Sequence, residues 1–237
     1  MNCARLACLA LILGSFSAVA QNISFAARIE LSKPGATRQA DPSGAVLWLI
    51  PAPDGGEFSG APKPARRQLL QKNKTFSPHL LVIPVGTAVD FPNQDPFFHN
   101  VFSLFEGKRF DLGLYESGSS RSVVFNRPGI SYIFCNIHPE MSAVVVALTT
   151  PYYGVSDRSG GIVIPAVPSG RYEMHIWHER VLPETLKSLT RFVTVSETTN
   201  SLVLKLTEQR NLSANHPNKY GKDYDPGNPN APAYVKP

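Results

Sequence analysis

Turn-forming residues recur along nearly the whole chain and limit it to short secondary-structure elements. The 237 residues include 21 Pro and 17 Gly, and no long stretch shows the apolar period of an amphipathic helix. Between the turns lie short apolar or alternating segments of the kind that form strands. With 43% hydrophobic and 17% charged residues, the chain is too apolar for disorder throughout. The sequence therefore predicts an all-β protein of one to two domains.

The expected strands fall into two blocks. The first block begins with strands over residues 23–31 and 45–50, then a turn-rich stretch over residues 51–64. It continues with strands over residues 68–76, 80–84, 88–91, 100–104, 122–125, 131–135 and 143–148. The second block contains strands over residues 162–166, 172–178, 192–195 and 202–206. Many short strands with frequent turns are typical of Greek-key sandwiches and barrels.

The N-terminus has the pattern of a secretory signal peptide. Residues 1–20 contain one positive charge at Arg5, an apolar run over residues 6–14 and small residues at Ala18 and Ala20, as a cleaved export signal does. The apolar run is too short to cross a bilayer, and no later segment is long and apolar enough to do so. We therefore expect an exported, periplasmic protein without a membrane span, whose mature chain begins near Gln21.

Cleavage of that signal would leave one cysteine. Cys3 and Cys8 lie within residues 1–20, so only Cys135 remains. A single thiol cannot form an internal disulfide, and a free thiol outside the cytoplasm is exposed to oxidation. Cys135 is therefore a buried inert thiol, a partner in an intermolecular disulfide or a metal ligand, and its sequence context has to decide.

The charge distribution argues against nucleic-acid binding. The formal net charge is +5, but the excess is spread out, with +4 in residues 21–74, −2 in residues 75–149 and +2 in residues 150–237. Proteins that bind nucleic acid concentrate basic residues on one face and interleave them with aromatic ones. An exported protein also rarely meets nucleic acid, so we exclude this class of function.

The strongest chemical signal follows the strand expected over residues 131–135. Cys135, His138 and Met141 supply a thiolate, an imidazole and a thioether within seven residues. Soft sulfur with imidazole suits copper, and a trigonal set of two His and one Cys with a weak axial Met is the blue-copper pattern. That pattern needs a second His from elsewhere in the fold, and His99 follows the turn at residues 91–98 (FPNQDPFF).

In these features the sequence resembles the cupredoxins, and among them the amicyanin and plastocyanin-like proteins of the methylamine-utilisation type. The resemblance covers roughly residues 68–149 and includes a strand ending in Val85-Gly86-Thr87, the Phe-Pro-Asn-x-Asp turn, His99-Asn100-Val101 and Cys-x2-His-x2-Met. It implies a Greek-key sandwich that holds one type 1 copper ion through His99, Cys135, His138 and Met141. It also implies that Asn100 ties the two ligand loops together by hydrogen bonding.

Other metals and other histidines are weaker candidates. Zinc rarely takes a thioether ligand and usually takes carboxylates or more thiolates, and we expect Glu140 to point to solvent. We expect His79 to be a solvated or core-edge residue. His175 and His178, with Glu179, could suggest a second metal site, but two residues three positions apart on a strand face opposite sides. We therefore expect structural or surface roles for them.

A second module follows the cupredoxin-like region. Residues 156–206 resemble the carboxypeptidase-regulatory-like (transthyretin-like) β-sandwich, through Asp157, Gly160-Gly161 and Pro168-x-Gly170-x-Tyr172. Residues 27–31 and 45–49 resemble the opening strands of the same module, which would place the cupredoxin inside it. The alternative is that residues 45–50 form a first cupredoxin strand. We favour the split module.

These observations divide the chain into five expected segments. They are a signal peptide (1–20), N-terminal strands and a linker that form the first part of the C-terminal sandwich (21–64), a cupredoxin domain (65–149), a small second sandwich (150–207) and an extended or disordered tail (208–237). Within the tail, residues 216–222 (HPNKYGK) are interpreted as a recognition or packing segment without assigned chemistry.

The ligand set leads to two hypotheses about function. A trigonal site capped by Met141 has no open coordination position, which predicts outer-sphere electron transfer between Cu(II) and Cu(I) and no catalysis. The protein would then carry single electrons to or from a redox partner protein. The alternative is a periplasmic copper-binding or copper-handling protein whose second sandwich contacts a carbohydrate or a protein surface. The complete Cys/His/His/Met set favours electron transfer, because a copper chaperone would expose its metal more openly.

Overall fold

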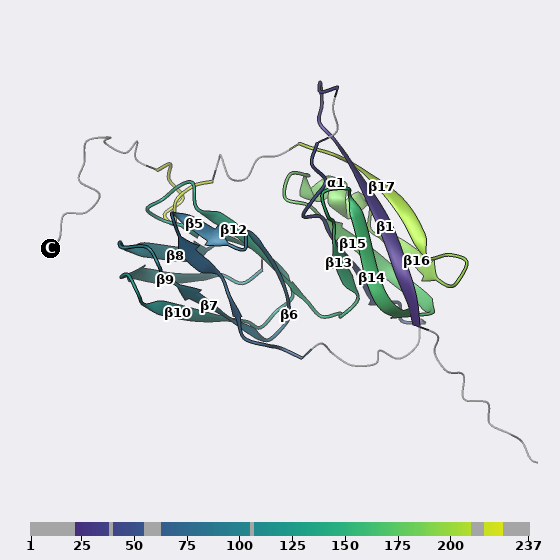
Figure 1. Ribbon diagram of the computed structural model, residues 1–237, viewed down its shortest axis with the longest axis horizontal. Coiled ribbons are helices and arrows are strands. Elements are labelled where there is room, and N and C mark those ends of the chain that lie inside the picture. Colours follow the sequence, from purple (N-terminus) through teal and green to yellow (C-terminus); the bar gives the residue numbers. More distant parts are fainter. Residues whose placement is uncertain (1–21, 38–39, 55–62, 105–106, 210–215, 225–237) are drawn as a thin grey trace, which may run out of the picture.

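Two β-sandwiches lie side by side in the computed structural model (Figure 1). The structure describes residues 22–37, 40–54, 63–104, 107–209 and 216–224, and within them nearly all regular structure is β-sheet, with one short helix. The predicted all-β class is therefore confirmed. The predicted signal peptide lies outside the described residues. No helix among the described residues is long and apolar enough to span a membrane.

The first sandwich, here called sandwich I, covers residues 67–148 and contains the predicted copper ligands. Its smaller sheet has the strand order β10-β7-β3, its larger sheet has the order β6-β12-β11-β8-β9, and the hairpin β4-β5 lies beside them. The strands are β3 (Arg67–Gln68), β4 (Leu70–Lys72), β5 (Thr75–Ser77), β6 (Leu80–Pro84), β7 (Thr87–Pro92), β8 (His99–Ser103), β9 (Phe110–Tyr115), β10 (Ser120–Phe125), β11 (Gly129–Cys135) and β12 (Ser142–Leu148).

Sandwich II takes its strands from both sides of sandwich I in the sequence. Its sheets have the orders β14-β1-β17 and β13-β2-β15-β16. The elements are β1 (Asn22–Ser32), β2 (Val46–Pro51), β13 (Tyr153–Val155), β14 (Gly161–Pro168), β15 (Gly170–Trp177), α1 (Pro183–Ser188), β16 (Arg191–Val195) and β17 (Ser201–Thr207). Among the described residues, β2 pairs with β13 and β15 and with no strand of sandwich I. The chain thus starts sandwich II, builds sandwich I and returns.

Both faces of the five-stranded sheet in sandwich I are covered. Ile133 and Cys135 face the core of sandwich I, whereas Tyr132 and Phe134 belong to a core cluster shared with sandwich II. The indole nitrogen of Trp177, in sandwich II, donates a hydrogen bond to the Tyr132 hydroxyl (3.3 Å). Successive side chains of a strand point to opposite faces, so a sheet covered on both sides needs apolar residues at consecutive positions. This requirement explains the consecutive apolar residues at 132–135 in β11 and at 143–148 in β12.

Four local elements differ from the prediction. Residues 68–76 do not form one strand, because Asn73 and Lys74 adopt left-handed backbone angles (φ 54° each) and reverse the chain between β4 and β5. The sequence analysis also missed the strands β9 and β13. It missed the helix α1 as well, which begins at Pro183, a residue suited to the first turn of a helix. The β4-β5 hairpin matters for the site, since its turn supplies hydrogen-bond donors there.

An ion pair connects the loop before β6 with the loop after β15. His79 Nε2 lies 2.7 Å from the Glu179 carboxylate, and His79 Nδ1 lies 3.1 Å from the carbonyl oxygen of Ser142. Both neighbours are acceptors, so the doubly protonated ring satisfies both. The hydrogen bond to Glu179 raises the pKa of His79 above its ordinary value. His79 therefore lies at the edge of the contact between the two sandwiches.

Replacing Glu179 with Gln should destabilise the protein more at pH 6 than at pH 9. Because the folded-state pKa of His79 is raised, the stabilisation is present at low pH and is lost as the pH rises through that pKa. His79 is about half exposed, so we expect a loss below about 1 kcal/mol, or a Tm decrease of about 2 °C at most. Thermal unfolding at both pH values measures the loss, with Glu184→Gln on α1 as the control. Equal losses at the two pH values would contradict the prediction.

Candidate metal centre

The pairing of β8 with β11 brings His99 and Cys135 to the same end of the five-stranded sheet. The strands are antiparallel with Cys135 opposite Val101, so the last residue of β11 lies beside the start of β8, which begins at His99. Both side chains are fully buried. Cys135 Sγ lies 3.6 Å from His99 Nδ1.

A tight turn brings His138 back to Cys135. The Met141 N–H donates to the carbonyl oxygen of His138 (3.0 Å), with Pro139 at the second position of the turn, where its restricted φ is favourable. The Cys135 N–H donates to the carbonyl oxygen of Met141 (3.3 Å) and closes residues 135–141, here called the ligand loop. As a result, His138 Nδ1 lies 3.5 Å from Cys135 Sγ and 3.1 Å from His99 Nδ1.

Three donor atoms therefore converge with a spacing that fits a metal ion. In the part of the chain that the structure describes, His99, Cys135 and His138 are the one group of His, Cys, Asp or Glu side chains close enough to share an ion. Their donor atoms form a triangle with sides of 3.6, 3.5 and 3.1 Å. The circle through its corners has a radius of about 2.0 Å, which is close to the length of a bond from zinc to imidazole nitrogen and slightly shorter than one to thiolate sulfur. The set fits one ion held by three donors.

Burial sets the protonation of these three groups. It lowers the pKa of His99 and lowers the pKa of His138 to about 4, so both imidazoles are neutral near pH 7. Burial raises the pKa of the Cys135 thiol, while hydrogen bonds from the backbone N–H groups of Asn100, Ile137 and His138 act in the opposite direction. A bound cation would favour the thiolate, because a metal ion is the largest local charge in such a site. Neutral imidazoles and a thiolate are the forms that bind metal.

Asp95 fixes the orientation of the His99 ring. Its carboxylate lies 2.9 Å from His99 Nε2 and can only accept a hydrogen bond when ionised, so Nε2 carries the proton and Nδ1 keeps its lone pair for a metal. The backbone N–H groups of Asn73 (2.6 Å) and Lys74 (3.0 Å) also donate to this carboxylate. Burial acts to raise the pKa of Asp95, but these hydrogen bonds and that from His99 outweigh it and hold the pKa below its ordinary value. Carboxylates often orient metal-binding histidines in this way.

Met141 and Asn100, which the resemblance also implied, lie beside the cluster. Met141 is fully buried and shares the core of sandwich I with Cys135. The backbone carbonyl of Asn100 accepts the N–H of Asn136 (3.1 Å), so the two segments that carry the predicted ligands are tied through their backbones. The side-chain amide of Asn100 donates to Asp111 instead (2.7 Å).

The other candidate residues lie apart from the cluster. The ring of His175 stacks on Trp48, with centroids 5.3 Å apart. His178 is buried directly after β15, and its Nδ1 accepts the N–H of Arg180 (3.2 Å). Both histidines thus make structural contacts. Glu140 is exposed in the turn of the ligand loop.

The sequence analysis missed the residues that support the cluster from outside the motif. Asp95 precedes His99 by four residues within the Phe-Pro-Asn-x-Asp turn, so a carboxylate in that position was a signal available from the sequence. Asp111, Lys219 and Tyr224 reach the ligand-bearing segments through tertiary contacts. No local sequence pattern marks those three.

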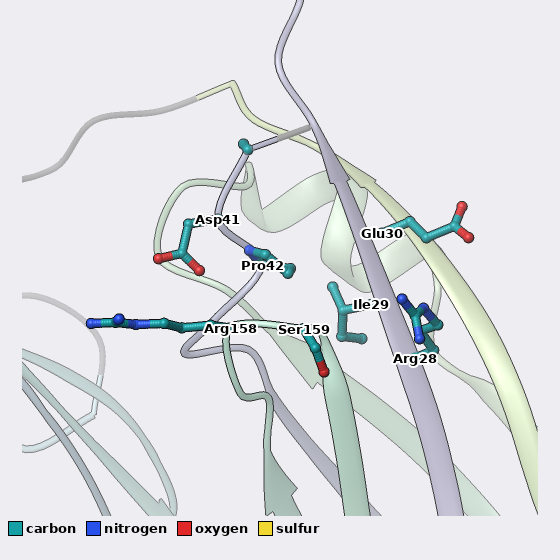
Figure 2. Close-up of a pocket in the computed structure, with 8 residues that line it drawn as sticks. Arg28, Ile29, Glu30, Asp41, Pro42, Arg158 and Ser159 are labelled. Carbon is teal, nitrogen blue, oxygen red and sulfur yellow. The ribbon is translucent and has the colours of Figure 1, made fainter. Parts of the chain in front are cut away.

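A hollow of about 440 Å³ lies in sandwich II, next to β1 (Figure 2). The side chains of Arg158 and Glu30 extend in opposite directions, away from the space beside Ile29. These two charged side chains therefore do not converge in the hollow as the donor atoms do in sandwich I. The candidate functional site is the His99, Cys135 and His138 cluster.

Comparisons with known proteins return structural likenesses only. No protein-family model and no curated protein matches this chain. Among solved structures, a purple cupredoxin from Nitrosopumilus maritimus is 28% identical over 35% of this chain and 99% of its own, with a TM-score of 0.32. The Cu-containing nitrite reductase NirK from Thermus scotoductus SA-01 is 24% identical over 40% of this chain and 25% of its own, with a TM-score of 0.34. Amicyanin from Paracoccus versutus is 20% identical over 42% of this chain and 91% of its own, with a TM-score of 0.32. Because these TM-scores are low, the assignment of a metal rests on the residues of the site and not on these structures.

Replacing Asp95 with Asn should weaken copper binding by about 10- to 100-fold, as the loss of such a supporting carboxylate does in other metal sites. It should also raise the reduction potential, because a nearby negative charge stabilises the oxidised ion more than the reduced one. Chelator competition measures the affinity and voltammetry the potential. The control is Asp54→Asn, which removes an exposed carboxylate of sandwich II that pairs with Arg171. If the two variants behave alike, Asp95 does not support the metal ligand.

Proposed function

We propose that His99, Cys135 and His138, with Met141 as a fourth ligand, hold one type 1 copper ion through which the protein carries single electrons. The observation that supports this proposal is the convergence of three buried donor atoms within 3.1 to 3.6 Å of one another. A thiolate, two imidazoles and a thioether form a soft donor set that suits copper. Zinc rarely binds through a thioether.

The chain provides a centre whose ligands hold their positions. Bound copper supplies a Cu(II)/Cu(I) couple that exchanges one electron at a time. Asp95 orients the ring of His99, and backbone hydrogen bonds close the ligand loop at Cys135 and Met141. Polar groups that are already in place need little rearrangement when the charge changes. This arrangement suits outer-sphere electron transfer.

Burial of the site favours electron transfer over catalysis, and we propose that the protein is not an enzyme. His99, Cys135 and Met141 are each 0% exposed, so they leave a substrate no open approach to the metal. His138 is half-buried and is the ligand nearest the surface. Its ring packs against Phe97 (centroids 5.5 Å apart). The residue before it in the sequence, Ile137, is exposed. We propose that electrons enter and leave through this ring.

We also propose that the protein works in the periplasm with a redox partner protein. The signal-peptide pattern of residues 1–20 supports export. Burial of Cys135 and its use as a metal ligand would protect a lone thiol in an oxidising compartment. Glu140, two residues after His138, is exposed, so a partner that approaches His138 would meet its charge.

Replacing Cys135 with Ser should abolish the intense thiolate-to-copper charge-transfer absorption of the Cu(II)-loaded protein. Serine supplies no thiolate, which removes the band. It is similar in size to cysteine, so circular dichroism should show a folded variant. The visible spectrum after Cu(II) loading is the measurement, and His79→Ala, outside the cluster, should retain the band. A band that persists in Cys135→Ser, or that is absent from the wild-type protein, would rule out a type 1 centre.

Replacing Glu140 with Lys should slow electron exchange with a cationic reagent and speed it with an anionic one, by up to about 10-fold at low salt. The difference should shrink as ionic strength rises, because exposed charges are screened over about 8 Å at physiological salt. Stopped-flow rates with hexaammineruthenium(II) and with ferricyanide measure the two directions. Glu197→Lys, on sandwich II, is the matched control. Equal rates for the two variants would place electron exchange away from Glu140.

A further inference from the structure

A segment near the C-terminus lies against the outside of the ligand loop. Residues 216–224 follow sandwich II in the sequence, yet they lie beside the end of sandwich I, where Figure 1 draws them in yellow. They belong to the part of the chain that the sequence predicted to be extended or disordered. Neither the metal-ligand motif nor the proposed function uses them.

Three hydrogen bonds join this segment to the ligand loop. The Tyr224 hydroxyl donates to the carbonyl oxygen of Cys135 (2.9 Å). The Lys219 N–H donates to the side-chain oxygen of Asn136 (3.0 Å). His216 Nε2 donates to the carbonyl oxygen of Pro139 (2.9 Å). Together these bonds hold the loop at its first, second and fifth residues.

Aromatic packing adds to these hydrogen bonds. The ring of His216 stacks on Phe134, the residue before Cys135, with centroids 3.8 Å apart and planes 21° apart. The ring of Tyr224 packs edge-on against His216 with centroids 5.3 Å apart. Burial raises the pKa of Tyr224, so its hydroxyl keeps the proton that it donates. The segment thus covers the residue before the ligand loop as well as the loop.

The same segment also contacts β9, the strand next to the one that carries His99. Lys219 Nζ lies 2.9 Å from the Asp111 carboxylate, which in turn accepts the side-chain amide of Asn100 (2.7 Å), the residue after His99. The hydrogen bond to Asp111 raises the pKa of Lys219, so the amine stays charged. Lys219 therefore contacts the ligand loop directly through its backbone and is linked to the segment that carries His99 through the Asp111 carboxylate.

A local turn gives the segment its shape. The Asn218 side-chain oxygen accepts the N–H groups of Tyr220 (2.9 Å) and Lys222 (3.2 Å), and the Gly221 N–H donates to the Asn218 carbonyl (2.9 Å). Asn favours such turns because its side chain bonds to nearby backbone groups. Gly221 has a φ of 73°, which glycine adopts without a steric penalty. The turn presents Lys219 to the site without help from a sheet or helix.

We propose that residues 216–224 form a C-terminal clamp that holds the ligand loop in its metal-binding shape before the metal arrives. His216, Lys219 and Tyr224 are positioning residues: His216 and Tyr224 hold carbonyl groups of the loop backbone, and Lys219 holds the side chain of Asn136. The clamp acts on the same site as the proposed function. Only the measurements on copper-loaded protein rest on that function, and hydrogen exchange in the metal-free protein does not. A loop held in its bound shape loses less entropy on binding, and its metal dissociates more slowly.

The clamp is tested first in the metal-free protein, by hydrogen exchange of the ligand-loop amides. Tyr224→Phe keeps the ring and removes the hydroxyl, which bonds to the Cys135 carbonyl and lies 3.4 Å from His216 Nδ1, so exchange at residues 135–141 should accelerate about 5-fold. A chain that ends at Gln209 removes the whole clamp and should exchange faster still. Tyr220→Phe is the matched control, since Tyr220 is 71% exposed in the same segment. Exchange over residues 170–177 of β15 should be unchanged in every variant.

Copper-loaded protein gives the second readout. Release of copper to a chelator should accelerate about 5-fold in Tyr224→Phe, and the copper–sulfur stretching band in the resonance Raman spectrum should shift. A merely structural role would lower Tm without moving that band.

Ligand-loop exchange equal to wild type in Tyr224→Phe would overturn the clamp, whether or not the shorter chain folds. A wild-type protein that binds no copper would remove the proposed function, and exchange in the metal-free protein would still decide the clamp.

Discussion

The antiparallel register between β8 and β11 is the constraint on which the candidate site depends. His99 begins one strand and Cys135 ends the other, so pairing Cys135 with Val101 places both residues at the same end of the sheet. A slip by one residue would turn Cys135 to the opposite face, because side chains alternate along a strand. That face holds Phe134, which packs in the cluster shared with sandwich II. The two faces differ in what they pack against, and this difference fixes the register.

Sandwich II is therefore part of what positions the site. Phe102, Phe134 and Val144 point out of sandwich I into the shared cluster, and burial of each such side chain contributes roughly 2 kcal/mol. Left uncovered, they would form an apolar patch of the kind that soluble monomers avoid. The order of the chain fits this dependence, since β1 and β2 precede sandwich I and pair with strands that follow it. The sheet that carries the predicted ligands is thus covered by a sandwich whose remaining strands follow that sheet in the sequence.

Interactions within a short stretch of sequence could be predicted, and interactions between distant segments could not. Cys135, His138 and Met141 share one short loop, so their spacing alone indicated the chemistry, and that chemistry required a second histidine. The role of Asp95 was hidden, because two of its donors come from a turn at Asn73 and Lys74 whose left-handed backbone is unusual without glycine. The contacts of residues 216–224 depend on the folded position of two distant segments, and apolar periodicity says nothing about such contacts.

A seven-residue loop has too few backbone groups to hold itself. The loop makes two internal hydrogen bonds between backbone groups, at Cys135 and at Met141, and its carbonyl groups at Cys135 and Pro139 need donors from elsewhere. Water could satisfy them, but exchanging water would not keep them in place. The protein uses Tyr224 and His216 instead, just as it places a carboxylate rather than water on the outer nitrogen of His99. Because these protein atoms already hold their positions, the proposed electron transfer would need little rearrangement around the site.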